Sequence, residues 1–171
     1  MATPYDSESM TRMTMIGRLG ALAATLGLAP AGAVLAEQKP EHYEVEHSPE
    51  EWHKLLSPER YAVLREHATE PAFSSPLDEE HRAGTYVCAA CARALFDAHT
   101  KFESGSGWPS FYRPLPHAVG ESSDDSFLMT RTEVHCARCG SHLGHVFDDG
   151  PKPTGLRYCI NGLALRFEPH S

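Results

Sequence analysis

Two short stretches decide the fold of this chain: Cys88-Ala89-Ala90-Cys91 and Cys136-Ala137-Arg138-Cys139. Each places two thiols at the spacing of a metal knuckle, in which a tight turn points both sulfurs at one ion. Four thiolates without another ligand are typical of structural Zn²⁺. Because 44 residues separate the two pairs, one ion would join two distant hairpins. We therefore predict a single zinc ion with a structural role, bound by Cys88, Cys91, Cys136 and Cys139.

Two other interpretations of these cysteines stay open. A local disulfide within each pair would suit an exported protein, and an iron–sulfur centre also uses four thiolates.

The composition of the chain is typical of one loop-rich globular domain. The 171 residues are 41% hydrophobic and include 13 Gly and 13 Pro, which is typical of a compact chain of ordinary domain size. The formal net charge is −8, and no stripe of Lys and Arg interrupts the acidic background. This balance excludes a general nucleic-acid binder.

The N-terminal segment has the features of a secretory signal. Arg12 and Arg18 flank the start of an apolar run over 19–36, and Val34-Leu35-Ala36 offers the small residues that a signal peptidase reads. We predict a cleaved signal peptide over 1–36 and a single mature domain over 37–171.

The signal also bears on location. A twin-arginine pair is absent, which favours the general secretory route, and we expect an exported, periplasmic protein with no stable membrane anchor after cleavage. An uncleaved anchor and a buried helix are the alternatives for the same run, and Met10 or Met13 could be the true start.

Two serine-proline pairs predict two short helices at the start of the mature domain. Ser48-Pro49-Glu50-Glu51 and Ser57-Pro58-Glu59-Arg60 each supply a capping serine, a proline at the first helical position and carboxylates in the first turn. The expected apolar faces are Trp52, Leu55 and Leu56 in the first helix, and Tyr61, Leu64 and Ala68 in the second.

From Gly84 onward the pattern changes to short strands. The segments 85–87, 127–135 and 163–167 are rich in β-branched and aromatic residues and are separated by glycines. We therefore predict a mainly-β or α+β fold, with an antiparallel core and the helices at its N-terminal side.

Cys159 is the one cysteine outside the two pairs. In a strand, Arg157, Cys159 and Asn161 share one face, so the guanidinium could lower the pKa of the thiol and favour a nucleophilic thiolate. From this local pattern alone, an inert buried cysteine is the commoner outcome.

Three longer motifs favour the nucleophile. They are 104–111 (SGSGWPSF), 142–148 (HLGHVFD) and 154–161 (TGLRYCIN). Together with both cysteine pairs and the lead-in over 48–76, they resemble the signatures of the B-class peptide methionine (R)-sulfoxide reductases. The resemblance implies two small antiparallel sheets, a structural zinc remote from catalysis, and Cys159 as the nucleophile. It further implies thiol-dependent reduction of the R epimer of peptide-bound methionine sulfoxide, which repairs oxidised proteins.

Other site residues follow from the same resemblance. Attack by a thiolate on a sulfoxide needs an acid for the departing oxygen, usually a histidine at neutral pH. We expect His145 to donate this proton and His142 to orient the polar groups. Trp108 would supply an apolar face for the ε-methyl group.

Two further residues would complete the site around the thiol. Asn161 would bond the substrate oxygen or its water network, and Arg157 would tune Cys159. From position alone, each of these side chains could equally be structural.

Ser106 marks a departure from many members of this family. The reaction leaves the nucleophile as a sulfenic acid, which a second cysteine in the Gly-Cys-Gly-Trp turn often resolves. Here that position is Ser106, so we expect a thioredoxin-like partner or another external thiol to reduce Cys159. A zinc ligand acting as resolver is the alternative.

Two other functions fit parts of the pattern. A zinc-stapled binding module would use the motifs as a recognition surface, and a Cys–His hydrolase would use the same nucleophile and base but lacks an evident oxyanion site.

Overall fold

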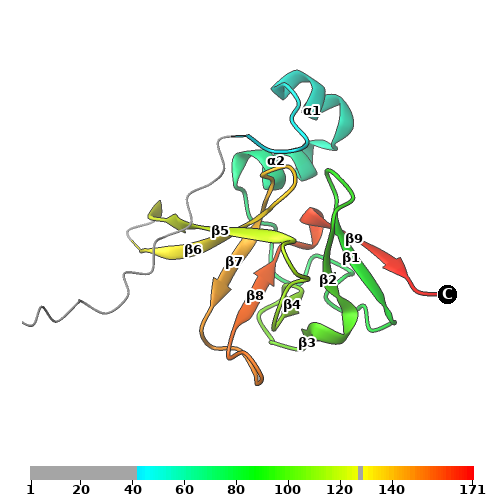
Figure 1. The fold of residues 1–171 in the computed structure, drawn as a ribbon, viewed down its shortest axis with the longest axis vertical. Helices are drawn as coiled ribbons and strands as arrows, with labels where there is room; N and C mark the ends of the chain where they lie inside the picture. Colours follow the sequence, from blue (N-terminus) through cyan, green and yellow to red (C-terminus); the bar gives the residue numbers. More distant parts are fainter. Residues whose placement is uncertain (1–41, 127–128) are drawn as a thin grey trace, which may run out of the picture. The chain divides into compact units, whose positions relative to one another are not determined.

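The structure is a computed structural model, and it describes residues 42–126 and 129–171. The described residues belong to one compact unit of the chain (Figure 1). The predicted signal peptide over 1–36 lies outside them. Within the described ranges, no helix has both the length and the apolar character needed to cross a membrane.

Both predicted helix starts are confirmed. Helix α1 (Pro49–Leu55) follows Ser48, whose hydroxyl and the Glu51 carboxylate form a reciprocal capping box. Helix α2 (Pro58–Glu66) follows Ser57, whose hydroxyl accepts from the amide of Arg60.

The prediction of the apolar faces was wrong for one residue, Leu55. Trp52 and Leu56 are buried as expected, but Leu55 is 60% exposed. Leu55 is the last residue of α1, and Leu56 is already its C-cap with an extended backbone, so the two side chains do not share one helical face and only that of Leu56 reaches the core. In α2, Leu64 is buried and Tyr61 packs against the core, and Ala68, just beyond the end of the helix, packs there too.

Two antiparallel sheets form the body of the domain, as the family resemblance implied. The first has the order β2-β1-β9 and the second the order β3-β4-β8-β7-β6-β5 (Figure 1). The strands are β1 (Gly84–Cys88), β2 (Ala94–Asp97), β3 (Lys101–Phe102), β4 (Ser110–Phe111), β5 (Val119–Asp124), β6 (Arg131–Cys136), β7 (His142–Phe147), β8 (Arg157–Ile160) and β9 (Leu165–Pro169).

Two predicted strands begin later than expected. The strand predicted over 127–135 begins at Arg131, and 127–128 lie outside the described residues. The strand predicted over 163–167 begins at Leu165, because Gly162–Ala164 form a 3₁₀ turn. The amide of Ala164 bonds the carbonyl of Asn161 in this turn, which turns the chain from the end of β8 into the other sheet.

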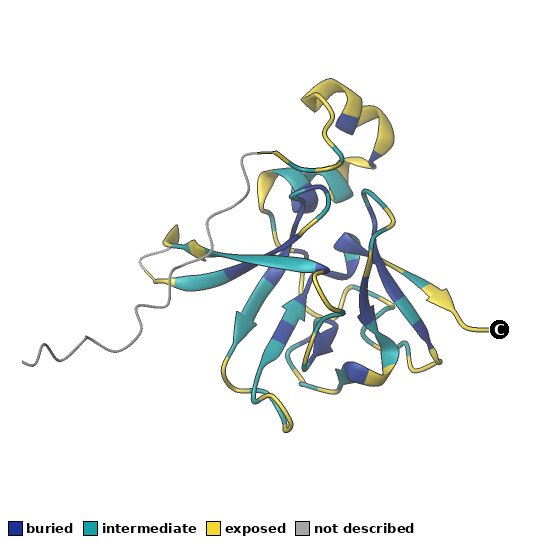
Figure 2. Ribbon diagram, in the orientation of Figure 1, coloured by how far each residue is buried: buried dark blue, intermediate teal, exposed yellow. Residues whose placement is uncertain are grey.

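Aromatic side chains fill the core between the two sheets. Phe96 of β2 stacks on Phe111 of β4 with ring centroids 4.3 Å apart, and Tyr86 of β1 meets the same ring edge-on at 4.9 Å. All three are fully buried, and buried residues lie along the facing strands (Figure 2). Aromatic packing of this kind adds to the free energy gained from burial alone, so it holds the two sheets together.

Candidate functional site

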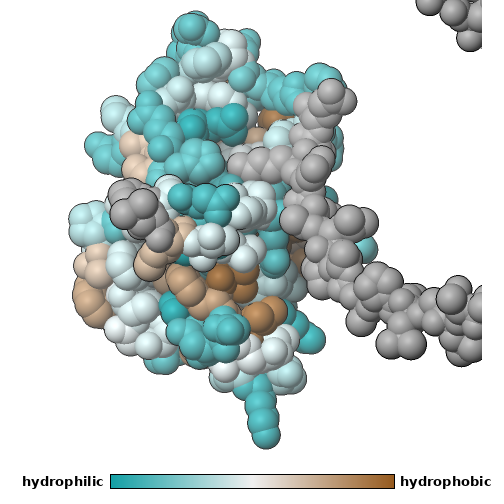
Figure 3. All heavy atoms as spheres, turned by 90° about the vertical axis from the view of Figure 1, so that its left-hand side faces the viewer, coloured by the Kyte–Doolittle hydropathy of each residue, from teal (hydrophilic) through white to brown (hydrophobic). Residues whose placement is uncertain are grey.

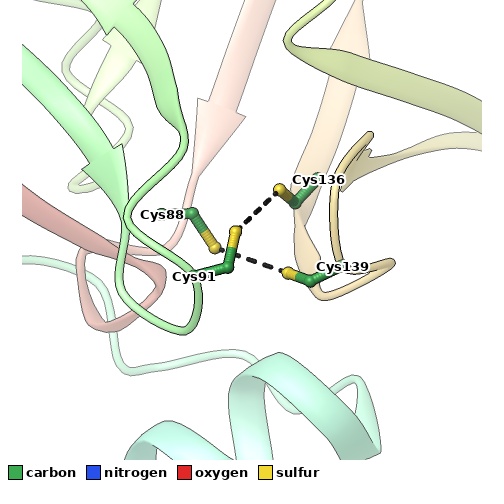
Figure 4. Close-up of side chains that lie close together, drawn as sticks. All are labelled: Cys88, Cys91, Cys136 and Cys139. Carbon is green, nitrogen blue, oxygen red and sulfur yellow. Dashed lines mark hydrogen bonds between the residues drawn. The ribbon is translucent and has the colours of Figure 1, made fainter. Parts of the chain in front are cut away.

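The four paired cysteines gather into one cluster at the junction of the two sheets (Figure 4). The sulfur of Cys88 lies 3.8 Å from that of Cys139, and the sulfur of Cys91 lies 3.6 Å from that of Cys136. A tetrahedral ion with bonds of about 2.3 Å to each sulfur would hold the sulfurs about 3.8 Å apart. All five cysteines of the chain are free thiols, so neither local disulfide is present. The donor set and its geometry fit one metal ion.

The two cysteine knuckles have the same backbone conformation. In each, the residue after the pair adopts a positive φ, 59° at Ala92 and 67° at Gly140, and its amide bonds the carbonyl of the first cysteine. The guanidinium of Arg138 donates to the carbonyl of Cys91 across the junction at 3.2 Å. Cys88 ends β1 of the first sheet and Cys136 ends β6 of the second, so an ion here would tie the sheets together.

Strand register places Cys159 opposite His145. In the second sheet, Ser110, Cys159, His145 and Glu133 pair in sequence across β4, β8, β7 and β6. Residues directly opposite in an antiparallel pair project from the same face, with Cβ atoms about 5 Å apart. The predicted nucleophile and proton donor therefore lie side by side on one face.

A β-bulge brings His142 to the same face. Three positions from His145, His142 would project from the opposite face of a regular strand. Between β6 and β7, however, Val134 pairs with Gly144 while His135 pairs with His142. Leu143 is therefore an extra residue, and it shifts the alternation by one. The rings of His142 and His145 end 5.5 Å apart.

A pocket of about 140 Å³ opens above this row of residues. It contains four of the predicted site residues, Trp108, His145, Cys159 and Asn161, and four others that the sequence did not single out, namely Thr69, Arg131, Gly144 and Phe147. His142 lines the neighbouring pocket. Arg157 lines neither of these two pockets, so it lies beside the site rather than in it.

Ser106 faces Cys159, with Oγ 3.8 Å from the sulfur. Its neighbours Gly105 and Gly107 have φ values of 70° and 86°, which favour glycine, and the turn they form points Ser106 at the thiol. Burial raises the pKa of the half-buried Cys159 above its ordinary value, and the Ser106 hydroxyl and the Arg157 guanidinium oppose the shift. The predicted effect of Arg157 on the pKa thus has the right sign, but desolvation outweighs it.

Arg157 is fixed beside the thiol by two other partners. Its Nε and one Nη donate to the two carboxylate oxygens of Asp149, each at 2.8 Å, and the guanidinium lies 4.5 Å from the centre of the Phe147 ring. This bidentate pair and the ring contact fix the side chain. Phe147 itself lines the pocket, so Arg157 also braces a pocket wall.

Asp124 is a site residue that the sequence did not reveal. Its carboxylate lies 2.7 Å from His145 Nε2, and bonds from Ser126 and from His145 hold the pKa of Asp124 well below its usual range. Because a carboxylate only accepts, Nε2 carries the proton and Nδ1 is the free nitrogen. Burial lowers the pKa of His145, partly offset by the bond to Asp124, so the site favours the neutral ring.

Glu70 is the second unpredicted residue of the site. Its buried carboxylate accepts the amides of Gly162 and of Leu163, the latter at 3.0 Å. Its backbone amide donates to Asn161 Oδ1 at 3.1 Å, and its carbonyl accepts Trp108 Nε1 at 3.1 Å. Asn161 also donates from Nδ2 to the carbonyl of Leu143, so its amide group ties three segments together.

Comparison with known proteins identifies the family. A model described as the SelR domain matches residues 56–169, a range that includes every residue of the pocket and both cysteine pairs. The chain belongs to the MsrB family of peptide methionine sulfoxide reductases. It is therefore an oxidoreductase, and the family resemblance seen in the sequence is confirmed.

Relatives named peptide methionine sulfoxide reductase MsrB match over most of their length. The protein of Leptospira interrogans is 56% identical over 128 residues, which cover 74% of this chain and 98% of that protein. The protein of Bradyrhizobium diazoefficiens is 59% identical over 123 residues, covering 71% and 88%. The protein of Methanosarcina barkeri is 56% identical over 125 residues, covering 72% and 88%.

The pairing of Asp124 with His145 predicts a measurable pKa change. Asp124→Asn removes the negative charge that stabilises the protonated ring, so the pKa of His145 will fall further below its ordinary value. Titration of the His145 ring protons by NMR checks this. Asp125→Asn, at the adjacent carboxylate, is the matched control and will leave the value unchanged. An unchanged or raised His145 pKa in Asp124→Asn would contradict the assignment.

Proposed function

We propose that this chain reduces the R epimer of methionine sulfoxide in oxidised proteins, with Cys159 as the nucleophile. The observation that carries the proposal is the direct cross-strand pairing of Cys159 with His145 at the floor of a pocket. The family to which the chain belongs supports the same reaction. Repair of oxidised proteins is the natural role for this chemistry.

The first step joins proton transfer to attack on sulfur. The neutral ring of His145 can accept the thiol proton of Cys159 at Nδ1 and return it to the sulfoxide oxygen as that oxygen leaves methionine. The thiolate attacks the sulfoxide sulfur and forms a transient bond between the two sulfurs. The protonated oxygen then passes to the sulfur of Cys159, which breaks both the S–O bond of the substrate and the bond between the sulfurs and releases methionine. A sulfoxide and a thiol thus become a sulfide and a sulfenic acid, with no other reactant.

The shape and apolar walls of the pocket support selection of one epimer. Trp108, held by its bond to the Glu70 carbonyl, and Phe147, held by Arg157, offer apolar surface for the ε-methyl group. A volume of about 140 Å³ suits one methionine side chain. The view from the side of β5 to β7 shows hydrophobic side chains gathered among hydrophilic ones (Figure 3), a surface that suits contact with another protein.

Three of the predicted residues take positioning roles in this scheme. Asn161 holds the Glu70 and Leu143 segments around the pocket, and its second Nδ2 hydrogen is its remaining donor toward substrate. Arg157 favours the thiolate of Cys159 and braces Phe147. His142 lies beside His145 and orients it from the bulge.

An external thiol would complete the cycle. The other four cysteines lie together in the cluster between the sheets, and the residue that faces Cys159 is Ser106, which cannot form a disulfide. A thioredoxin-like protein or another thiol would attack the sulfenic acid, release water and form a mixed disulfide. A second thiol would then restore Cys159.

We assign zinc to the four-cysteine cluster. We also assign the protein to the periplasm, after export. Four thiolates at tetrahedral spacing suit Zn²⁺ in a closed structural site, and Cys88, Cys91, Cys136 and Cys139 would hold it. The apolar run and small residues before Glu37 support cleavage and export to the periplasm. One equivalent of zinc per chain and a mature N-terminus at Glu37 are the corresponding measurements.

Turnover of the two methionine sulfoxide epimers in a blocked peptide, with dithiothreitol or thioredoxin, tests the reaction. We expect activity on the R epimer alone, its loss in Cys159→Ser, and a fall in kcat of about 10²–10⁴-fold in His145→Gln. His99→Gln, at an exposed histidine outside the pocket, will keep full activity. Ester hydrolysis without added thiol, or reductase activity in Cys159→Ser, would overturn the proposal.

Mass spectrometry after treatment with excess sulfoxide tests whether the catalytic cycle runs without a second cysteine of the same chain. The wild-type protein will trap as a sulfenic acid adduct at Cys159. In Ser106→Cys the introduced thiol faces Cys159, so the same treatment will give an internal disulfide, whereas Ser104→Cys will not. A wild-type disulfide between Cys159 and a cysteine of the metal cluster would contradict the external route.

A further inference from the structure

A second group of metal-binding side chains lies outside the four-cysteine cluster. One oxygen of Glu133, on β6, lies 2.9 Å from His142 Nδ1 and 3.1 Å from His67 Nδ1. His142 begins β7 and His67 caps the end of α2. The three potential ligand atoms lie within 4.8 Å of one another. Two imidazole nitrogens and one carboxylate oxygen therefore converge on one point.

Burial makes this group more than a surface ion pair. Glu133 is 5% exposed and His142 is 2% exposed. Nε2 of His142 is buried and has no hydrogen-bond partner among the described residues. A metal on Nδ1 requires the tautomer whose proton is on Nε2, and the bond that Nδ1 now makes to Glu133 is replaced by coordination of both groups to the same ion.

The surroundings favour a cation. The group lines a pocket of about 630 Å³, and three further carboxylates, from Glu66, Asp124 and Asp125, line the same pocket. Among the described residues that line this pocket, Arg131 is the one lysine or arginine, and it is paired with Asp124 at 2.7 Å. The local charge is therefore negative, which attracts a divalent ion.

We propose that His67, Glu133 and His142 form a second zinc site. Two histidines and one glutamate are a protein ligand set used for zinc, with a fourth position left for water, and here that position would face the pocket. Ser122 donates its hydroxyl to the other Glu133 oxygen at 2.8 Å. Such a bond fixes a ligating carboxylate in place.

Occupation of this site would inhibit the enzyme. The ring of His142 lies 5.5 Å from that of His145. Zinc on Nδ1 of His142 would fix this ring and take it out of its positioning role beside the proposed proton carrier. This effect rests on the proposed function, whereas metal binding at the site does not.

Cobalt titration of the purified full chain, with its four-cysteine cluster already loaded with zinc, tests the site directly. Wild type will bind one further equivalent of Co²⁺, with visible d–d bands but no sulfur-to-cobalt charge-transfer band. His67→Gly removes a ligand and keeps the φ of 59° at this position without strain. It will weaken binding of the second ion by more than about tenfold. His81→Ala, at another exposed histidine, will bind as wild type does.

Turnover under added zinc provides the second readout. His67→Gly will match wild type without added metal and will need at least about tenfold more Zn²⁺ for half inhibition. Retention of the zinc in the four-cysteine cluster confirms that the variant is folded. A wild-type chain that binds no second Co²⁺ ion, or a His67→Gly variant that binds it equally well, would overturn the second site. Binding without inhibition would overturn only its effect on turnover.

Discussion

The close approach of strands β7 and β8 at Gly144 is the contact on which the rest of the site depends. A Cβ at Gly144 would lie 2.1 Å from the carbonyl oxygen of Cys159 and 3.0 Å from Cα of Ile160, so only glycine allows the strands to pair here. That pairing sets His145 opposite Cys159. The bulge at Leu143 then adds His142 to the same face.

The contacts that stabilise the fold lie between the two sheets, whereas the proposed site lies on one face of the second sheet. The aromatic cluster of Tyr86, Phe96 and Phe111 and the four-cysteine cluster lie between the sheets, and together they hold β1 and β6 in fixed positions. The pocket instead opens on one face of the second sheet, where the segment around Glu70 closes it. The chemistry proposed for Cys159 would therefore not involve the thiols of the four-cysteine cluster.

The sequence revealed those features that depend on residue type at short spacing. The two cysteine pairs and the caps at Ser48 and Ser57 could be found this way, whereas Trp108, His145 and Cys159 were predicted through the family resemblance of the motifs that contain them. Asp124 and Glu70 could not, because their roles arise from contacts with residues 21 and 91 positions away. The net pKa shift of Cys159 also escaped prediction, because it depends on burial, which the local Arg157-x-Cys159 pattern does not report.

The most direct test of the account is the activity of Gly144→Ala measured together with its metal content. The added methyl group must push β7 away from β8, so we predict that reductase activity falls at least about 10²-fold, the loss expected when reacting groups move by about 1 Å. The metal of the four-cysteine cluster will remain bound, because its ligands lie at the ends of β1 and β6. Full activity in Gly144→Ala would contradict the claim that this strand pairing assembles the site.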